Sequence, residues 1–231
     1  MPESGPDGVL VVFDCDGVLV ETEAVDARVQ QQAFAELGVD LTVEEIAERF
    51  AGGTGEHFAA ELARVLGSAL DFDWHERFGD RYTRAYEREL TSVPGVEGVL
   101  DALDRLDVDR CVASNSTPDH LHAVLSLTGL LPRFAGRMFS AIEVARGKPA
   151  PDLFLHAAAT LGYPPERCVV VEDSVAGVTA ARAAGMAVLG YVGGLTPRAR
   201  LEPLATEVFT DMTALPVLLG RYGVGAQPAR R

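Results

Sequence analysis

The chain has 231 residues, and its 34 acidic and 20 basic side chains give it a formal net charge of −14. This length allows a sizeable hydrophobic core in one large domain or two small ones. A surface this acidic repels nucleic acids and anionic membranes, so we expect neither as a partner. Three scattered cysteines, none in a CxxC pair, argue against a disulfide framework and a zinc site, and predict a reduced, cytoplasmic protein.

Residues 9–13, VLVVF, form a continuous apolar run that is too short for a helix. Such a run predicts a strand buried on both faces of a parallel sheet. Similar runs predict three more strands, at 109–114, 167–173 and 186–191. Helical patterns alternate with these strands, at 96–106, 117–130, 151–162 and 173–185. This alternation predicts an α/β fold with a Rossmann-like open parallel sheet.

Residues 23–92 break the alternation, because they hold amphipathic helical patterns with no strand between them. We expect this segment to be an all-helical cap domain inserted after the first strand. The α/β core is then predicted to comprise residues 1–22 and 93–231. Within it, we expect residues 223–231 to form a disordered tail.

Polar residues stand where the predicted strands end. Acidic pairs follow two of these strands, a serine–asparagine pair ends another, and a lysine precedes a helix: Asp14 and Asp16, Glu172 and Asp173, Ser114 and Asn115, and Lys148. Each of these residues alone is typical of a turn, a helix cap or a solvated surface. Ligands of open parallel sheets bind at the carboxyl ends of the strands, so the combination predicts a functional site there.

The chemistry of such a site follows from its charges. Clustered carboxylates repel one another unless a cation neutralises them, and hard oxygen ligands suit Mg²⁺. One carboxylate can then attack a phosphate as a nucleophile. A second carboxylate two residues later can protonate the leaving oxygen and afterwards activate water. Ser114 and Lys148 can hold the phosphate oxygens and balance their charge.

Four segments in this order resemble the motifs of the haloacid dehalogenase superfamily: DCDGVLVETE at 14–23, SNST at 114–117, GKPAPDLF at 147–154 and VVVEDSVAGVTAARAAGM at 169–186. The fourth resembles the subfamily that has a helical cap after its first motif. The resemblance implies that Asp14 is the nucleophile and Asp16 the general acid/base. It implies phosphate binding by Ser114, Asn115 and Lys148. It also implies Mg²⁺ held by Asp14, the backbone carbonyl of Asp16 and Asp173, with Glu172 close by.

The resemblance also bears on the reaction. True dehalogenases of the family lack the second aspartate of the first motif, so Asp16 favours phosphoryl chemistry. The β-phosphoglucomutase branch uses a histidine, a lysine and an arginine of the cap, where this chain has Asp26, Ala51 and Gly55. We therefore expect a Mg²⁺-dependent phosphatase that hydrolyses the monoester of a small phosphorylated metabolite, a sugar or sugar-acid phosphate, through an aspartyl-phosphate.

Two alternatives stay open at this point. One is an isomerase of the β-phosphoglucomutase type. The other is a non-enzymatic phospho-acceptor signalling domain, which also uses acidic residues and a lysine on a parallel sheet but has no cap. Whether the protein is a monomer or a dimer does not follow from the sequence.

A cysteine and a pair of histidines are further candidates for a catalytic or metal-binding role. Cys15 lies between the two aspartates, but a cysteine phosphatase needs an arginine six residues later, where this chain has Glu21. We expect Cys15 to be a packing residue. His120 and His122 stand two apart on a predicted helix and so point to different faces, which argues against a metal site formed by this pair.

Overall fold

The computed structural model describes residues 8–50, 55–68 and 71–224. Within these residues, one parallel sheet has the strand order β3-β2-β1-β4-β5-β6. Its strands are β1 (Leu10–Phe13), β2 (Arg110–Ser114), β3 (Met138–Ser140), β4 (Cys168–Glu172), β5 (Ala187–Tyr191) and β6 (Glu207–Phe209). The predicted open parallel sheet is confirmed, and β1 lies in its interior between β2 and β4.

Strands β3 and β6 were not predicted from the sequence. Each has three residues, and each is partly exposed because it lies at an edge of the sheet. A segment this short does not produce a recognisable apolar run or alternation. The four longer strands were predicted at their observed places to within two residues.

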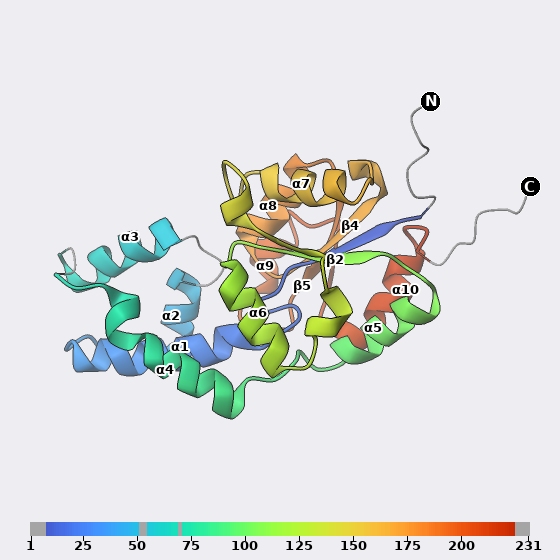
Figure 1. The fold of residues 1–231 in the computed structure, drawn as a ribbon. Coiled ribbons are helices and arrows are strands. Elements are labelled where there is room, and N and C mark those ends of the chain that lie inside the picture. Colours follow the sequence, from blue (N-terminus) through green and yellow to red (C-terminus); the bar gives the residue numbers. More distant parts are fainter. Residues whose placement is uncertain (1–7, 51–54, 69–70, 225–231) are drawn as a thin grey trace, which may run out of the picture.

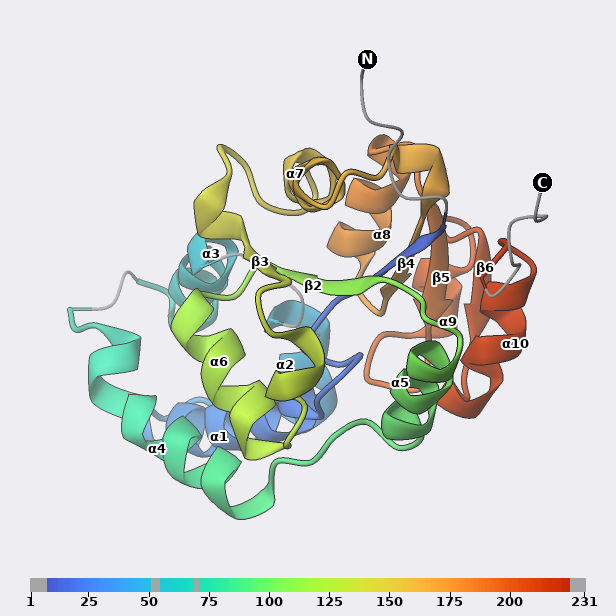
Figure 2. The same ribbon diagram turned by 45° about the vertical axis from the view of Figure 1, so that its right-hand side comes forward.

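Helices cover both faces of the sheet (Figures 1 and 2). One face packs against α5 (Val96–Arg105), α6 (Pro118–Leu127) and α10 (Leu215–Gly220). The other packs against α7 (Asp152–Thr160), α8 (Val175–Ala183) and α9 (Arg198–Leu201). Short 3-10 helices complete the connections: η1 (Leu131–Phe134), η2 (Ala141–Glu143), η3 (Pro165–Arg167) and η4 (Met212–Ala214).

The unbroken apolar run of β1 follows from this arrangement. Successive side chains of a strand point to opposite faces of the sheet. Val11 and Phe13 therefore enter the core on the side of α5, whereas Leu10 and Val12 enter the core on the side of α7. All four are fully buried, so neither face of β1 tolerates a polar residue until the strand ends at Asp14.

The inserted segment forms four helices with a core of their own. These are α1 (Thr22–Glu36), α2 (Val43–Phe50), α3 (Gly55–Leu66) and α4 (Trp74–Glu89), and they lie beside the sheet in Figure 1. The ring of Phe34 lies 5.2 Å from that of Trp74 and 5.4 Å from that of Phe50. This core contains no residue of the sheet. We propose that these helices are the cap, with the boundaries expected from the sequence.

Two chain segments join the cap to the sheet, and they run side by side. The Glu21 N–H donates to the Thr91 carbonyl, and the Val93 N–H donates to the Leu19 carbonyl, both at 3.0 Å. Val20 and Ser92 form an antiparallel bridge between the same segments. The cap is therefore attached through one paired connection next to the first motif.

The carboxyl-terminal segment packs further than expected. Val224, placed in the predicted tail, is 7% exposed and joins the core beside α10. Residues 225–231 lie outside the described residues, so the expectation for them stays a prediction. No helix in the described part of the chain is long and apolar enough to span a membrane.

Candidate active site

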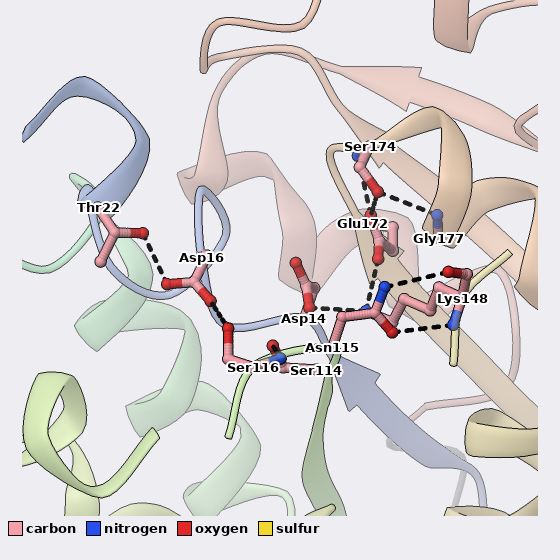
Figure 3. A network of polar contacts seen from close by, with 10 residues as sticks. All are labelled: Asp14, Asp16, Thr22, Ser114, Asn115, Ser116, Lys148, Glu172, Ser174 and Gly177. Atoms are coloured by element: carbon pink, nitrogen blue, oxygen red, sulfur yellow. Dashed lines mark hydrogen bonds and ion pairs between the residues drawn. The ribbon is translucent and has the colours of Figure 1, made fainter. Parts of the chain in front are cut away.

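The predicted site residues gather at the edge of the sheet where the strands have their carboxyl ends, and Figure 3 shows all of them except Asp173. Phe13 pairs in register with Val112 of β2 and Val171 of β4. Asp14 thus lies level with the last residues of both neighbouring strands. The Asp14 N–H donates to the Val171 carbonyl at 3.0 Å, which fixes the backbone of this residue.

A buried lysine links two of the predicted acids. The Nζ of Lys148 donates to Oδ1 of Asp14 at 2.6 Å and to Oε1 of Glu172 at 2.7 Å. Lys148 is only 3% exposed. Burial alone would lower its pKa, but the two carboxylates outweigh burial and raise it, so the ammonium group stays charged. Burial raises the pKa of Asp14 to about 7, with Glu172 and Asp16 adding to the effect and Lys148 opposing it.

Asn115 and Ser174 hold this lysine and its partner in place. The amide of Asn115 accepts from the Lys148 N–H at 2.8 Å and donates to the Lys148 carbonyl at 3.1 Å. The other oxygen of Glu172 accepts from both the N–H and the hydroxyl of Ser174. A Cβ at Gly177 would lie 1.6 Å from Oε1 of Glu172, so only glycine fits there. The side chain of Asn115 thus orients Lys148, and its expected contact with phosphate stays a prediction.

Asp16 points away from this group, toward the cap and α6. Its carboxylate accepts from the hydroxyl of Thr22 at 2.7 Å and that of Ser116 at 2.8 Å, and lies 2.9 Å from Nε2 of His120. Burial would raise the pKa of Asp16, but His120, Thr22 and Ser116 outweigh it and lower the pKa to about 2. Asp16 is therefore a carboxylate in this arrangement, and its deprotonated form has three donors.

Three buried acidic residues lie close enough together to bind a metal cation. One oxygen each of Asp14, Glu172 and Asp173 lie within 4.8 Å of one another, and all three residues are buried. Both oxygens of Asp173 are buried and have no hydrogen-bond partner among the described residues. Burial, Glu23 and Glu172 raise the pKa of Asp173 well above its usual value. Such unpartnered hard oxygens are the donors that Mg²⁺ prefers. The oxygens of Glu172 already accept from Lys148 and Ser174, so Asp14 and Asp173 fit a direct role best.

Close packing at Gly17 keeps Asp173 in position. Gly17 has a φ of +81°, a conformation that L side chains rarely adopt, and a Cβ there would lie 2.0 Å from Oδ2 of Asp173. The loop after Asp16 can therefore cross the acidic group only because residue 17 is glycine.

A cavity of about 620 Å³ lies over this edge of the sheet. Its floor includes Asp14, Asp16, Ser114, Lys148 and Asp173, so the structure gathers these predicted site residues around one space. Ser114 is buried, and its hydroxyl accepts from the Ser116 N–H at 3.1 Å. The roof of the cavity comes from α1, α2, α3 and α4.

Sequence reasoning missed several residues of the site. His120 was considered only as half of a metal pair, and Thr22 and Ser116 only as parts of motifs. A signal existed for His120, because Thr117 caps α6 and the first turn of that helix starts at the carboxyl edge. Cys15 is fully buried, and burial raises the pKa of its thiol well above the usual value, which fits a packing residue.

The chain belongs to the haloacid dehalogenase-like hydrolase family, whose model matches residues 9–185. Among solved structures, it is similar to a conserved haloacid dehalogenase-like protein of unknown function from Agrobacterium tumefaciens. The two share 38% identity with a TM-score of 0.81, over 94% of this chain and 99% of that one. A hydrolase of the same family from Deinococcus radiodurans, solved with bound phosphate and sodium, shares 35% identity with a TM-score of 0.80, over 96% and 99% of the two chains.

The chain is also similar to two curated proteins, of which the first is named for its activity. The 6-phosphogluconate phosphatase of Escherichia coli is 30% identical over 209 residues, which cover 90% of this chain and 93% of that protein. The CbbY protein of Rhodobacter capsulatus is 33% identical over 190 residues, which cover 78% and 83% of the two chains.

The substitution Lys148→Met tests the buried charge network. It removes the cation from a group that keeps three carboxyls, so we expect the free energy of unfolding to fall by about 3–5 kcal/mol near neutral pH. The loss should be smaller at about pH 5, where the raised pKa values of Asp14 and Asp173 let these two carboxyls take up protons. Urea denaturation at both pH values measures it.

The matched control is Arg64→Met, which removes an exposed cation paired with Glu61. Its denaturation midpoint should stay nearly unchanged. An equal loss in both variants, or no loss in Lys148→Met, contradicts a central role for the buried lysine.

Proposed function

We propose that this protein is a Mg²⁺-dependent phosphatase that hydrolyses the monoester of a small sugar-type phosphate. The observation that carries the proposal is the state of Asp14. This carboxylate is buried beside a cavity, one of its oxygens is fixed by Lys148, and the other receives no hydrogen bond within the described residues. The named phosphatase among the relatives supports the same reaction.

Asp14 acts as the nucleophile. Its free oxygen attacks phosphorus, a bond forms between this oxygen and the phosphoryl group, and the bond from phosphorus to the substrate oxygen breaks. Lys148 and Ser114, which line the same cavity, contact the phosphoryl oxygens. Asp14, Asp173 and the Asp16 carbonyl would hold Mg²⁺, which would supply the positive charge that lets an anionic substrate approach these carboxylates.

Asp16 moves the protons. It protonates the leaving oxygen in the first step and takes a proton from the attacking water in the second. In the structure, its carboxylate is hydrogen-bonded to Thr22, Ser116 and His120 and holds its charge. To act as an acid, Asp16 must therefore leave these donors and gain a proton. Water then attacks the phosphoryl group, which releases phosphate and restores Asp14.

The roof of the cavity argues against the two alternatives. A mutase must hold a doubly phosphorylated intermediate, yet no lysine or arginine of the described cap residues lines the cavity. Asp26 stands where the mutases have histidine, Gly55 begins α3, and Ala51 lies outside the described residues. A phospho-acceptor signalling domain has no cap, whereas four helices lie over this site. We also propose a cytoplasmic location, which the free, buried state of Cys15, Cys111 and Cys168 supports.

Phosphate release tests the proposal. With Mg²⁺, the purified protein should release phosphate from p-nitrophenyl phosphate and from hexose phosphates. Asp14→Asn should lower kcat by about 10³-fold or more, because an amide is not a nucleophile toward phosphorus. Cys15→Ala is the control, and its kcat should stay within about threefold of the unchanged protein. Equal turnover by Asp14→Asn, or loss of turnover in Cys15→Ala alone, contradicts the assignment.

The dependence of stability on pH and metal tests the acidic group. Burial and neighbouring charges raise the pKa of Asp14 to about 7 and that of Asp173 well above its usual value. The metal-free folded protein thus binds more protons than the unfolded chain between about pH 5 and about pH 8, and its free energy of unfolding falls as pH rises. Mg²⁺ should therefore raise the Tm more at about pH 8 than at about pH 5.

Calorimetry of two variants completes this test. Asp173→Asn should remove the rise in Tm that Mg²⁺ produces. Asp80→Asn, which changes an exposed aspartate of α4, should keep it. A rise in Tm that survives Asp173→Asn places the metal elsewhere.

A further inference from the structure

The cap wall of the cavity carries a polar group that the proposed mechanism does not use. Helix α1 places Asp26 and Gln30 one turn apart, and α4 places Tyr82 and Tyr86 one turn apart. All four line the cavity. The Tyr86 hydroxyl donates to Oδ1 of Asp26 at 2.5 Å, and Nε1 of Trp74 donates to the Tyr82 hydroxyl at 3.0 Å. The two helices thus meet through side chains that can all hydrogen-bond.

Two acceptors of this group lack a donor. Gln30 is 8% exposed, and its Oε1 is buried without a hydrogen-bond partner among the described residues. The second carboxyl oxygen of the partly buried Asp26 receives no hydrogen bond from the described residues and is open to the cavity. Leaving a buried acceptor unpaired is unfavourable, so such atoms are normally satisfied by water or a ligand. A ligand that satisfies these acceptors must bring donors, and hydroxyl groups are donors.

The charges around the cavity exclude an acidic leaving group at this wall. The charged carboxylate of Asp16 lines the cavity and repels another carboxylate, and no lysine or arginine of the described cap residues lines it to attract one. The Lys148 ammonium already contacts two carboxylates, and His120 already contacts Asp16. His75 also lines the cavity. This histidine is exposed, and its ring stacks on that of Phe58.

A second cleft offers the opposite chemistry. It adjoins the first through Lys148 and Ser174, and Arg49, Arg64 and Arg200 line it. Arg64 is paired with Glu61. A leaving group that carried a carboxylate would avoid the acidic wall and lie in this cleft. The two clefts therefore correspond to two substrate classes that experiment can separate.

We propose that the cavity selects the phosphate ester of an uncharged polyhydroxylated compound, a sugar or a polyol, over an ester whose leaving group carries a carboxylate. Gln30 and Asp26 determine this specificity by accepting hydrogen bonds from substrate hydroxyls. The cavity volume of about 620 Å³ is large enough for a sugar or polyol phosphate. The inference rests on the proposed phosphatase function and narrows its substrate class.

The test compares two esters with the same six-carbon chain and the same phosphate position, D-glucitol 6-phosphate and 6-phosphogluconate. We expect kcat/KM to be about tenfold or more higher for the polyol ester. Titration calorimetry with Asp14→Asn protein should give the same order of Kd values without turnover.

Variants of α1 locate the effect. Acetyl phosphate, whose leaving group has no hydroxyl, serves as the reference substrate. The ratio of kcat/KM for the polyol ester to kcat/KM for acetyl phosphate should fall about tenfold in Gln30→Leu. Gln32→Leu makes the same change on the exposed side of α1 and should leave this ratio unchanged.

The outcomes separate the two proposals. Turnover that favours 6-phosphogluconate, survives Gln30→Leu and falls in Arg200→Gln overturns the specificity inference and leaves the phosphatase function standing. Equal turnover of both esters also overturns the inference. Preferential binding of the polyol ester without phosphate release from any ester supports the specificity inference and overturns the phosphatase function.

Discussion

The ion pairs that the buried Lys148 ammonium makes with Asp14 and Glu172 set the chemistry of this protein. Burial favours a protonated, unreactive Asp14, whereas the neighbouring ammonium favours the ionised form that can attack phosphorus. The geometry of these pairs depends on residues that follow two other strands. Asn115 after β2 fixes the lysine backbone, and Ser174 after β4 fixes Glu172. The parallel sheet is therefore the means by which distant segments hold one lysine in place.

The second aspartate connects this charge network to the cap. Its carboxylate accepts from Thr22, the first residue of α1, and from Ser116 and His120 on the core side. The ring of His120 lies edge-on to Tyr86 of α4, and Tyr86 bonds Asp26. A continuous set of contacts thus runs from the acid/base to the wall that we propose reads the substrate.

Much of the fold followed from the sequence, because it depends on local patterns. The apolar run before Asp14 predicted the interior strand, and the polar residues after the strands predicted the edge where they gather. Strands β3 and β6 were too short to produce a pattern. The contacts of Asp16 with His120 and of Asn115 with Lys148 join segments about a hundred and about thirty residues apart. Such pairings depend on helix rotation and side-chain direction, which no local pattern specifies. Gln30 was missed for the same reason, because a lone glutamine in a helix is ordinary.

The measurement that tests this account most directly is the identification of the phosphorylated residue during turnover. The protein is quenched in acid while it hydrolyses a substrate ester, treated with borohydride and digested, and the peptides are analysed by mass spectrometry. Borohydride reduces an acyl phosphate to an alcohol, so the account predicts homoserine at position 14 and an unchanged residue at Asp16. Modification at Asp16 or Cys15 instead, or phosphate release with no modification at position 14, would contradict the assignment of Asp14 as the nucleophile.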